Sequence, residues 1–280
     1  MKNEKVWLIT GSSRGLGRAL ASKVAATGDI VVATSRNIAD LLPLKEAYPA
    51  QVIGMALDVT DQIAINEVVK NVIKKYGRID VLVNNAGYGN INSIEETPLE
   101  DFRAQMETNL FGTVSLTKAV LPHMRECRSG HIIQYSSVGG RIGPIGRGAY
   151  AAAKWGVEGF SEVLQKEVSP LGIKVTIIEP GGFRTDFAGS STKISAGLAD
   201  YSSTVGATAQ FQQDFNGKQP GDPDKAAKAV IEVVGSANPP LRLLLGTDAL
   251  KAVAANDQER LKQLEAWRWL SETTDRDAAN

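Results

Sequence analysis

Short apolar runs alternate with segments of helical length along this chain. Residues 6–10 and 30–34 are strand-like runs, and the segment 16–27 between them has the length of a helix. Residues 52–57 form the next run, and the amphipathic segment 61–76 follows it. Further strand-like runs, each preceded by a helix-length segment, occur at 81–83, 131–135, 174–178 and 241–245. This alternation predicts an α/β fold.

The strand-like runs are continuously apolar, which is typical of strands buried on both faces. Parallel strands covered by helices on both sides have this property, and right-handed crossovers then produce a doubly wound, Rossmann-type sheet. The 280 residues contain no internal repeat and no low-complexity linker. We therefore predict one domain spanning 1–280.

Two segments depart from the alternation. Residues 187–223 are rich in Ser, Thr, Gly and Ala, and such a long irregular stretch predicts a substrate lid or a poorly ordered loop. Residues 248–280 form a predicted C-terminal helical extension. Its apolar residues have helical spacing, which favours a helix docked on the body or on a partner subunit: Leu261, Leu264, Trp267 and Leu270.

The charges of the chain cancel, with 31 basic and 31 acidic residues. Nothing therefore suggests a nucleic acid or membrane partner. The single cysteine, Cys127, cannot form an internal disulfide, and we expect it to be a packing residue. The N-terminal apolar run is too short for a signal peptide or a membrane span. Together these features predict a cytoplasmic protein.

A glycine cluster follows the first predicted strand and opens the first predicted helix. It reads Thr10-Gly11-Ser12-Ser13-Arg14-Gly15-Leu16-Gly17. Glycines permit a tight turn, and the free amides and dipole of the helix N-terminus favour a pyrophosphate. We predict cofactor contacts at Gly11, Ser13, Arg14, Gly15, Leu16 and Gly17.

Three motifs together resemble the short-chain dehydrogenase/reductase family: the spacing G-x-x-x-G-x-G of the glycine cluster, the run Asn84-Asn85-Ala86-Gly87, and the pair Tyr150-x-x-x-Lys154. The resemblance covers nearly the whole chain. Within the family, the segments 85–89 and 179–183 and the extended tail are most similar to the group of 17β-hydroxysteroid dehydrogenases, whose bacterial members need not use steroids.

The segment after the second strand favours NADP(H) over NAD(H). It reads Thr34-Ser35-Arg36-Asn37, without the carboxylate that usually binds the ribose hydroxyls of NAD. Arg36 and Arg14 are instead suited to a 2′-phosphate. The alternative is that both arginines are solvated surface charges.

The resemblance implies further cofactor contacts. Asp58 and Val59 resemble the pair that contacts adenine, although Asp58 is also a candidate helix N-cap. The other implied positions are Asn85, Ala86 and Gly87 after the fourth strand, Pro180, Gly181, Phe183 and Thr185 after the sixth, and the catalytic pair Tyr150 and Lys154. Glu179, before this second turn, stands where many relatives carry asparagine.

Tyr150 and Lys154 are four residues apart and share one face of a helix. A phenol has a pKa near 10, too high for a base at neutral pH. An ammonium at roughly 4 Å attracts the phenolate by about 4 kcal/mol at an effective dielectric of about 20. This attraction lowers the phenol pKa by up to about three units before desolvation subtracts from it. The pair therefore predicts proton transfer to or from the oxygen of a carbonyl or alcohol.

Two more residues complete the predicted catalytic group. Ser137 lies thirteen residues before Tyr150, as the substrate-orienting serine of the family does, and its neighbour Ser136 is the alternative. Asn109 resembles the helix asparagine of the family's proton relay. The other interpretation of Asn109 is a structural asparagine at a helix bend.

Other chemistries have little support in the sequence. Two histidines and one cysteine without H-E-x-x-H spacing argue against a metal site, and Ser137 lacks the G-x-S-x-G context of a hydrolase. A sugar epimerase or dehydratase of the same family normally has another glycine spacing and a larger C-terminal domain. An NADP-binding sensor or scaffold is expected to lack Tyr150 or Lys154.

We expect an apolar ketone or alcohol as the small-molecule substrate. The aromatic residues of the lid are candidates for its walls, with the core or a subunit contact as the alternative: Phe187, Tyr201, Phe211 and Phe215. The family usually forms dimers or tetramers through the helices that carry Asn109 and Tyr150. The small residues around Tyr150 permit such close packing, so we expect a homodimer or homotetramer.

Overall fold

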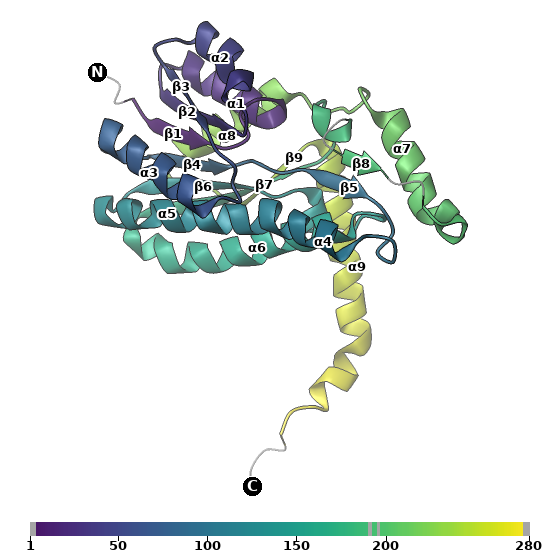
Figure 1. The fold of residues 1–280 in the computed structure, drawn as a ribbon. Helices are drawn as coiled ribbons and strands as arrows, with labels where there is room; N and C mark the ends of the chain where they lie inside the picture. Colours follow the sequence, from purple (N-terminus) through teal and green to yellow (C-terminus); the bar gives the residue numbers. More distant parts are fainter. Residues whose placement is uncertain (1–3, 190–191, 195–196, 277–280) are drawn as a thin grey trace.

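In the computed structural model, which describes residues 4–189, 192–194 and 197–276, seven parallel strands form the central sheet (Figure 1). Their order is β3-β2-β1-β4-β6-β7-β9. The strands are β1 (Val6–Ile9), β2 (Ile30–Ser35), β3 (Val52–Ala56), β4 (Val81–Asn84), β6 (Gly130–Tyr135), β7 (Ile173–Pro180) and β9 (Arg242–Leu245). The predicted doubly wound parallel sheet is confirmed, and each predicted strand lies within a residue or two of its expected bounds.

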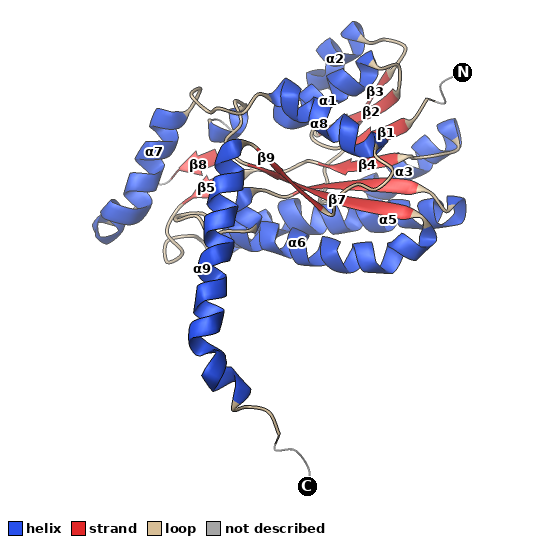
Figure 2. Ribbon diagram, turned by 180° about the vertical axis from the view of Figure 1, so that it is seen from behind, coloured by secondary structure: helices blue, strands red, loops and turns tan. Residues whose placement is uncertain are grey.

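Helices cover both faces of this sheet (Figures 1 and 2). The helices are α1 (Gly15–Ala26), α2 (Leu42–Ala47), α3 (Gln62–Tyr76), α4 (Leu99–Met106), α5 (Gly112–Cys127), α6 (Gly148–Val168), α7 (Ala207–Phe215), α8 (Pro223–Gly235) and α9 (Thr247–Glu272). Helices α1 and α8 pack together in one hydrophobic core, whereas α3, α5 and α6 supply the other. Successive side chains of β1 alternate between the two cores, as strand geometry requires.

Seven shorter helical turns join these elements in the described residues. They are Ile38–Leu41, Glu107–Phe111, Val138–Gly140, Ser169–Leu171, Asp186–Ala188, Ala199–Tyr201 and Ser202–Gly206. The turn Glu107–Phe111 has π-helical hydrogen bonding and joins α4 to α5. Such π-turns are frequent at functional sites.

The ends of α3 follow from its sequence. The Asp61 carboxylate accepts hydrogen bonds from the amides of Ile63 and Ala64, and Gly77 ends the helix at a φ of 71°. Asp61, not Asp58, is therefore the N-cap of this helix, and the capping interpretation of Asp58 is wrong.

The sheet changes direction between β1 and β4. The chain first adds β2 and β3 on one side of β1, and then continues with β4, β6, β7 and β9 on the other. Loops leaving adjacent strands at such a point separate and leave a crevice at the carboxyl ends of the strands. The glycine cluster follows β1 and Asn85 follows β4, so both lie at this crevice.

The segment 187–223 contains regular structure that its composition did not indicate. The short strand β8 (Thr192–Ile194) pairs in parallel with β5 (Gly89–Ile91), and α7 follows further along. Figure 2 shows the two-stranded sheet and α7 beside the carboxyl-end edge of the main sheet. The described part of this segment is therefore not irregular as its composition suggested, and its role as a substrate lid stays a prediction.

Helix α9 contacts the body along its first half, as far as Asp257 and Arg260, which both contact Arg141. Ala249 and Val253 are buried, whereas Leu261, Leu264 and Trp267 are each more than half exposed. Leu270 is also exposed, and Figures 1 and 2 show the helix projecting away from the body. The expected docking of these residues on the body is therefore wrong. No helix in the described part of the chain, α9 included, is long and apolar enough to cross a membrane.

Cys127 is exposed at the end of α5 and is not a packing residue as expected. Its sulfur lies 3.5 Å from Nε2 of His123, one helical turn earlier. Because α5 ends at this residue, its thiol lies beyond the buried face that Val120 and Met124 form.

Candidate active site

A cavity of about 1460 Å³ lies at the carboxyl ends of β1, β4, β6 and β7. Almost all the residues predicted to form the site line it. They are Gly11, Ser13, Arg14, Gly15, Leu16, Arg36, Asp58, Val59, Asn85, Ala86, Gly87, Ser137, Tyr150, Lys154, Pro180, Gly181, Phe183 and Thr185. Gly17 and Asn109 are the predicted residues outside this lining.

The glycine loop is held in shape by contacts with the end of β4. Gly11 and Gly15 have φ values of 65° and 59°, which other residues rarely adopt. A Cβ on Gly17 would lie 2.3 Å from Nδ2 of Asn85 and 2.5 Å from the Gly11 carbonyl oxygen. The Asn85 amide donates to the Thr10 carbonyl at 2.9 Å. Gly17 therefore permits close packing, and the Asn85 side chain supports the loop.

Two arginines and two aspartates line the cavity beyond the ends of β1, β2 and β3. Arg14 and Arg36 are both exposed and both line it, and β2 ends at Ser35 without a carboxylate. The Asp58 carboxylate accepts hydrogen bonds from the amide and hydroxyl of Thr60, at 2.9 and 2.7 Å, which fixes its orientation at the rim.

The turn after β7 is fixed from two sides. The amide of Gly182 donates to Oδ2 of Asp248, in the first turn of α9, at 2.7 Å. Phe183 forms a backbone bridge with Gly221. A Cβ on Gly15 would lie 3.5 Å from Cβ of Thr185, so this turn packs beside the glycine loop. Sequence reasoning missed Asp248, which carries no motif signal.

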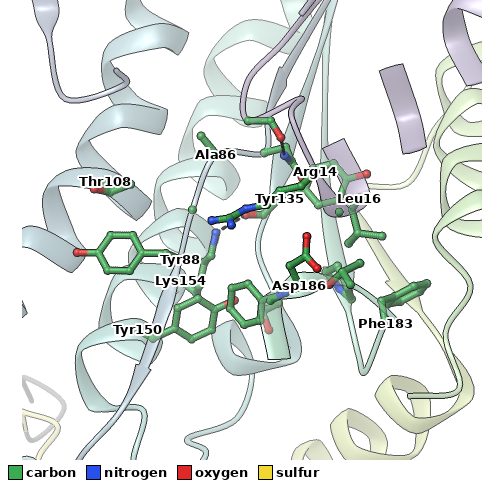
Figure 3. A pocket seen from close by; sticks show the side chains of 18 of the residues that line it. Arg14, Leu16, Ala86, Tyr88, Thr108, Tyr135, Tyr150, Lys154, Phe183 and Asp186 are labelled. Carbon is green, nitrogen blue, oxygen red and sulfur yellow. Dashed lines mark hydrogen bonds between the residues drawn. The ribbon is translucent and has the colours of Figure 1, made fainter. Parts of the chain in front are cut away.

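Tyr150, Ser137 and Lys154 meet on one wall of the cavity. A Cβ on Gly139 would lie 3.2 Å from Cε1 of Tyr150 and 3.6 Å from Oγ of Ser137, so the two side chains are neighbours. Nζ of Lys154 lies 5.9 Å from the centre of the Tyr150 ring. Lys154 also donates to the backbone carbonyl of Tyr135 at 2.7 Å. Figure 3 shows Tyr150 and Lys154 beside each other and Arg14 across the cavity.

Burial shifts the pKa values of Tyr150 and Lys154, which both lie on α6. It raises the pKa of Tyr150, while the hydrogen bond with Ser137 and the charge of Arg147 act in the opposite direction. Burial lowers the pKa of Lys154 to about 8, and the carboxylate of Glu158 opposes that change. Arg147 is thus a second cation beside the phenol that the sequence did not indicate, and the effect of Lys154 on the phenol stays a prediction.

Asn109 is fully buried in the π-turn and is not among the residues that line the cavity. Its Oδ1 accepts from the amide of Tyr88 at 3.1 Å, and its Nδ2 donates to the Tyr88 carbonyl at 3.0 Å. A Cβ on Gly87 would lie 2.5 Å from this Oδ1 and 3.7 Å from Nζ of Lys154. Asn109 therefore fixes the chain after β4 beside Lys154, and its predicted place in a proton relay stays a prediction.

Glu179 belongs to a buried ionic cluster beneath the site. Its carboxylate lies 3.2 Å from Nη1 of Arg141 and 3.6 Å from Nε of Arg242. Arg242 also contacts the buried Glu158 at 3.0 Å. Burial, followed by the neighbouring Glu158 charge, raises the pKa of Glu179 to about 7.

Aromatic residues of the segment 187–223 line the mouth of the cavity. The Phe187 ring lies 5.6 Å from that of Tyr150, and Phe211 and Phe215 stack at 5.1 Å. All three line the cavity. Tyr201 does not belong to the lining, and its hydroxyl donates to Glu95 at 2.7 Å. Three of the four predicted wall residues are thus in place.

The fold and these side chains define a class, an α/β oxidoreductase with a glycine-rich loop after its first strand. The chain belongs to the short-chain dehydrogenase/reductase family: the family model described as short chain dehydrogenase matches residues 5–195. The chain is 47% identical over 268 residues to the oxidoreductase BOA17 of Botryotinia fuckeliana, covering 95% of this chain and 98% of that one.

Solved structures agree with this assignment. A short-chain dehydrogenase from Streptomyces avermitilis superposes with a TM-score of 0.93 at 42% identity, covering 98% of this chain and 100% of that one. An alcohol dehydrogenase from the archaeon Thermococcus sibiricus, complexed with 5-hydroxy-NADP, has a TM-score of 0.72 at 26% identity, covering 87% and 96%.

Proposed function

We propose that this protein is an NADP(H)-dependent oxidoreductase that transfers a hydride between the nicotinamide and a carbonyl or secondary alcohol. The observation that carries the proposal is that Tyr150, Ser137 and Lys154 lie together on the wall of the cavity that the glycine loop also lines. A proton donor and an orienting hydroxyl then face the same space.

The residues present fit a nicotinamide dinucleotide. Gly11 and Gly15 hold the strained turn of a phosphate loop, and a Cβ on Gly17 would collide with it. The amides at the start of α1 would hold the pyrophosphate, and the turn 180–185 would hold the nicotinamide end. When bound, this cofactor supplies or accepts the hydride.

Side chains of the protein bind the substrate oxygen and transfer its proton. We propose that Ser137 donates a hydrogen bond to the substrate oxygen and positions it beside Tyr150. In reduction the Tyr150 hydroxyl gives its proton to that oxygen, and in oxidation the phenolate takes it back. Lys154, held by the Tyr135 carbonyl, keeps a positive charge near the ring and favours the phenolate.

A screen of NADPH oxidation against ketones, aldehydes and quinones tests this proposal. We expect turnover of at least one carbonyl class. Binding of NADPH without turnover of any compound would favour an NADP-binding sensor or scaffold. Turnover only of nucleotide sugars would favour an epimerase or dehydratase.

Cofactor preference is a separate prediction. We expect kcat/KM to be higher with NADPH than with NADH, because Arg14 and Arg36 line the cavity where a 2′-phosphate would lie. Arg36→Ala is expected to lower kcat/KM for NADPH by about 10-fold or more and to leave the value for NADH nearly unchanged. Comparable values for both cofactors in the unaltered protein would contradict the prediction.

The substrate is proposed to have an apolar body. Phe187, Phe211 and Phe215 supply aromatic surface at the mouth of the cavity, close to Tyr150. The similarity to the 17β-hydroxysteroid dehydrogenase group and the cytoplasmic location stay predictions of the sequence.

We also predict a homodimer or homotetramer formed through α5 and α6. Large apolar side chains on this face are exposed, with Phe111, Trp155 and Val163 at 48%, 40% and 55%. Burying them between copies would stabilise the assembly. Multi-angle light scattering is expected to give a mass two or four times that of the chain, and Val163→Asp is expected to shift it towards the monomer. A monodisperse monomer would overturn the prediction.

A further inference from the structure

Arg147 lies beside the proposed proton donor, three residues before it at the start of α6. Its guanidinium carbon is 5.9 Å from the centre of the Tyr150 ring and 5.9 Å from that of Phe187. The side chain lines the cavity. It therefore stands between the catalytic helix and the segment that covers the substrate end.

The hydrogen bonds of this guanidinium are incomplete. Nη2 donates to Oε1 of Gln212, on α7, at 2.9 Å. Nη1 is buried without an acceptor, next to Gly89, where a Cβ would lie 3.1 Å from it. A buried donor without a partner costs free energy, so an acceptor is expected to complete the site.

Aromatic rings, and no carboxylate of the described residues, lie against the charge of Arg147. It forms no ion pair with any Asp or Glu among the described residues. Burial lowers its pKa, which is the sign of a cation that is poorly solvated. Arg141 and Arg242, by contrast, are each paired with carboxylates. A partly buried, unpaired guanidinium is costly unless an anion reaches it.

We propose that Arg147 recognises an anionic group, such as a carboxylate, on the substrate. The substrate class is then an oxo acid or hydroxy acid with an apolar body, whose carbonyl or alcohol faces Tyr150 while its acid group binds the guanidinium. Lys193, which also lines the cavity, adds positive charge at the same end. The inference rests on the proposed oxidoreductase function and adds a substrate class to it.

A different role for Arg147 would be to stabilise the Tyr150 phenolate, since its charge lowers the pKa of that phenol. The two roles differ in what they change. Substrate recognition changes KM for acids only, whereas phenolate stabilisation changes kcat and its pH profile for acids and neutral ketones alike.

Benzoylpropionate and benzoylbutyrate, each with its methyl ester, test the proposal in steady-state assays with NADPH. We expect the acids to have the higher kcat/KM. Arg147→Met is expected to lower this value about 10- to 100-fold for the acids and only slightly for the esters. Arg147→Lys should recover part of the loss. Arg125→Met removes the same charge from the exposed surface of α5 and is the matched control.

Calorimetric binding of phenylbutyrate to the NADP complex separates this inference from the reaction itself, because this acid has no carbonyl. If phenylbutyrate binds and Arg147→Met abolishes this binding, the acid site is supported. If no ketone is reduced in the same protein, the proposed reaction fails and the acid site does not. The inference is overturned if phenylbutyrate binds no better than phenylbutanol. Equal losses for acids and esters in Arg147→Met, with a shifted pH profile of kcat, would also overturn it.

Discussion

Tyr150→Phe is expected to lower kcat by about 10²- to 10⁴-fold, the range that positioned acid–base groups contribute. The substitution removes only the hydroxyl of Tyr150 and leaves the buried ring in place beside Ser137. Steady-state NADPH oxidation with the best carbonyl substrate measures the loss. Circular dichroism and NADPH affinity are expected to remain within a few-fold of the unaltered protein.

Tyr76→Phe is the matched control for this experiment. It removes the same atom from a tyrosine at the end of α3, away from the cavity lining, and is expected to keep full activity. A Tyr150→Phe protein that retains more than a tenth of the original kcat would show that another group supplies the proton.

Arg242→Met is expected to be the most destabilising single change in the charged cluster under the site. It removes the cation 3.0 Å from Glu158 and 3.6 Å from Glu179, two carboxylates that are 5% and 0% exposed. Breaking a buried pair from one side costs about 3 kcal/mol. For a chain of this size that corresponds to a fall in Tm of roughly 6–12 °C. Arg268→Met, which breaks exposed pairs on α9, should leave Tm nearly unchanged.

The loss in Arg242→Met is expected to depend on pH. The pKa of Glu179 in the folded protein, about 7, is above the ordinary value of 4.5, so the folded state holds this proton more tightly. The resulting contribution to stability is present at low pH and is lost as pH rises through 7. Removing Arg242 raises the cost of ionising Glu179 further. The difference in Tm between the unaltered protein and Arg242→Met should therefore be small near pH 5 and large near pH 8. Equal differences at the two pH values would indicate that the substitution acts through lost packing and not through lost charge.

The sheet could be predicted from the sequence because its strands are buried on both faces. Their apolar runs, such as Val81 to Val83, need no knowledge of distant residues. The cavity lining could be predicted for a related reason: the turns after β1, β4 and β7 carry their own glycines, and parallel topology brings those turns together. Tyr150 and Ser137 were predicted from the resemblance to the family, since their spacing alone is common.

What the sequence did not indicate depends on contacts between distant segments. Strand β8 forms only because it pairs with β5, about a hundred residues earlier. Asp248 and Arg147 lie in no motif, and their importance comes from the Gly182 amide and the Tyr150 ring that they meet in space. The helical spacing in α9 predicted a helix correctly, yet spacing alone does not say which surface covers it.

The position of α9 determines what the intrinsic fluorescence of this protein reports. Of its four tryptophans, Trp7 is buried, and Trp267 and Trp269 lie on the projecting end of α9. The fourth, Trp155 on α6, lies 4.6 Å from the guanidinium of Arg260 on α9. Indoles in water emit at longer wavelengths than buried ones. The emission spectrum should therefore follow the surroundings of the C-terminal helix, and a blue shift with rising protein concentration would detect its burial without any added label.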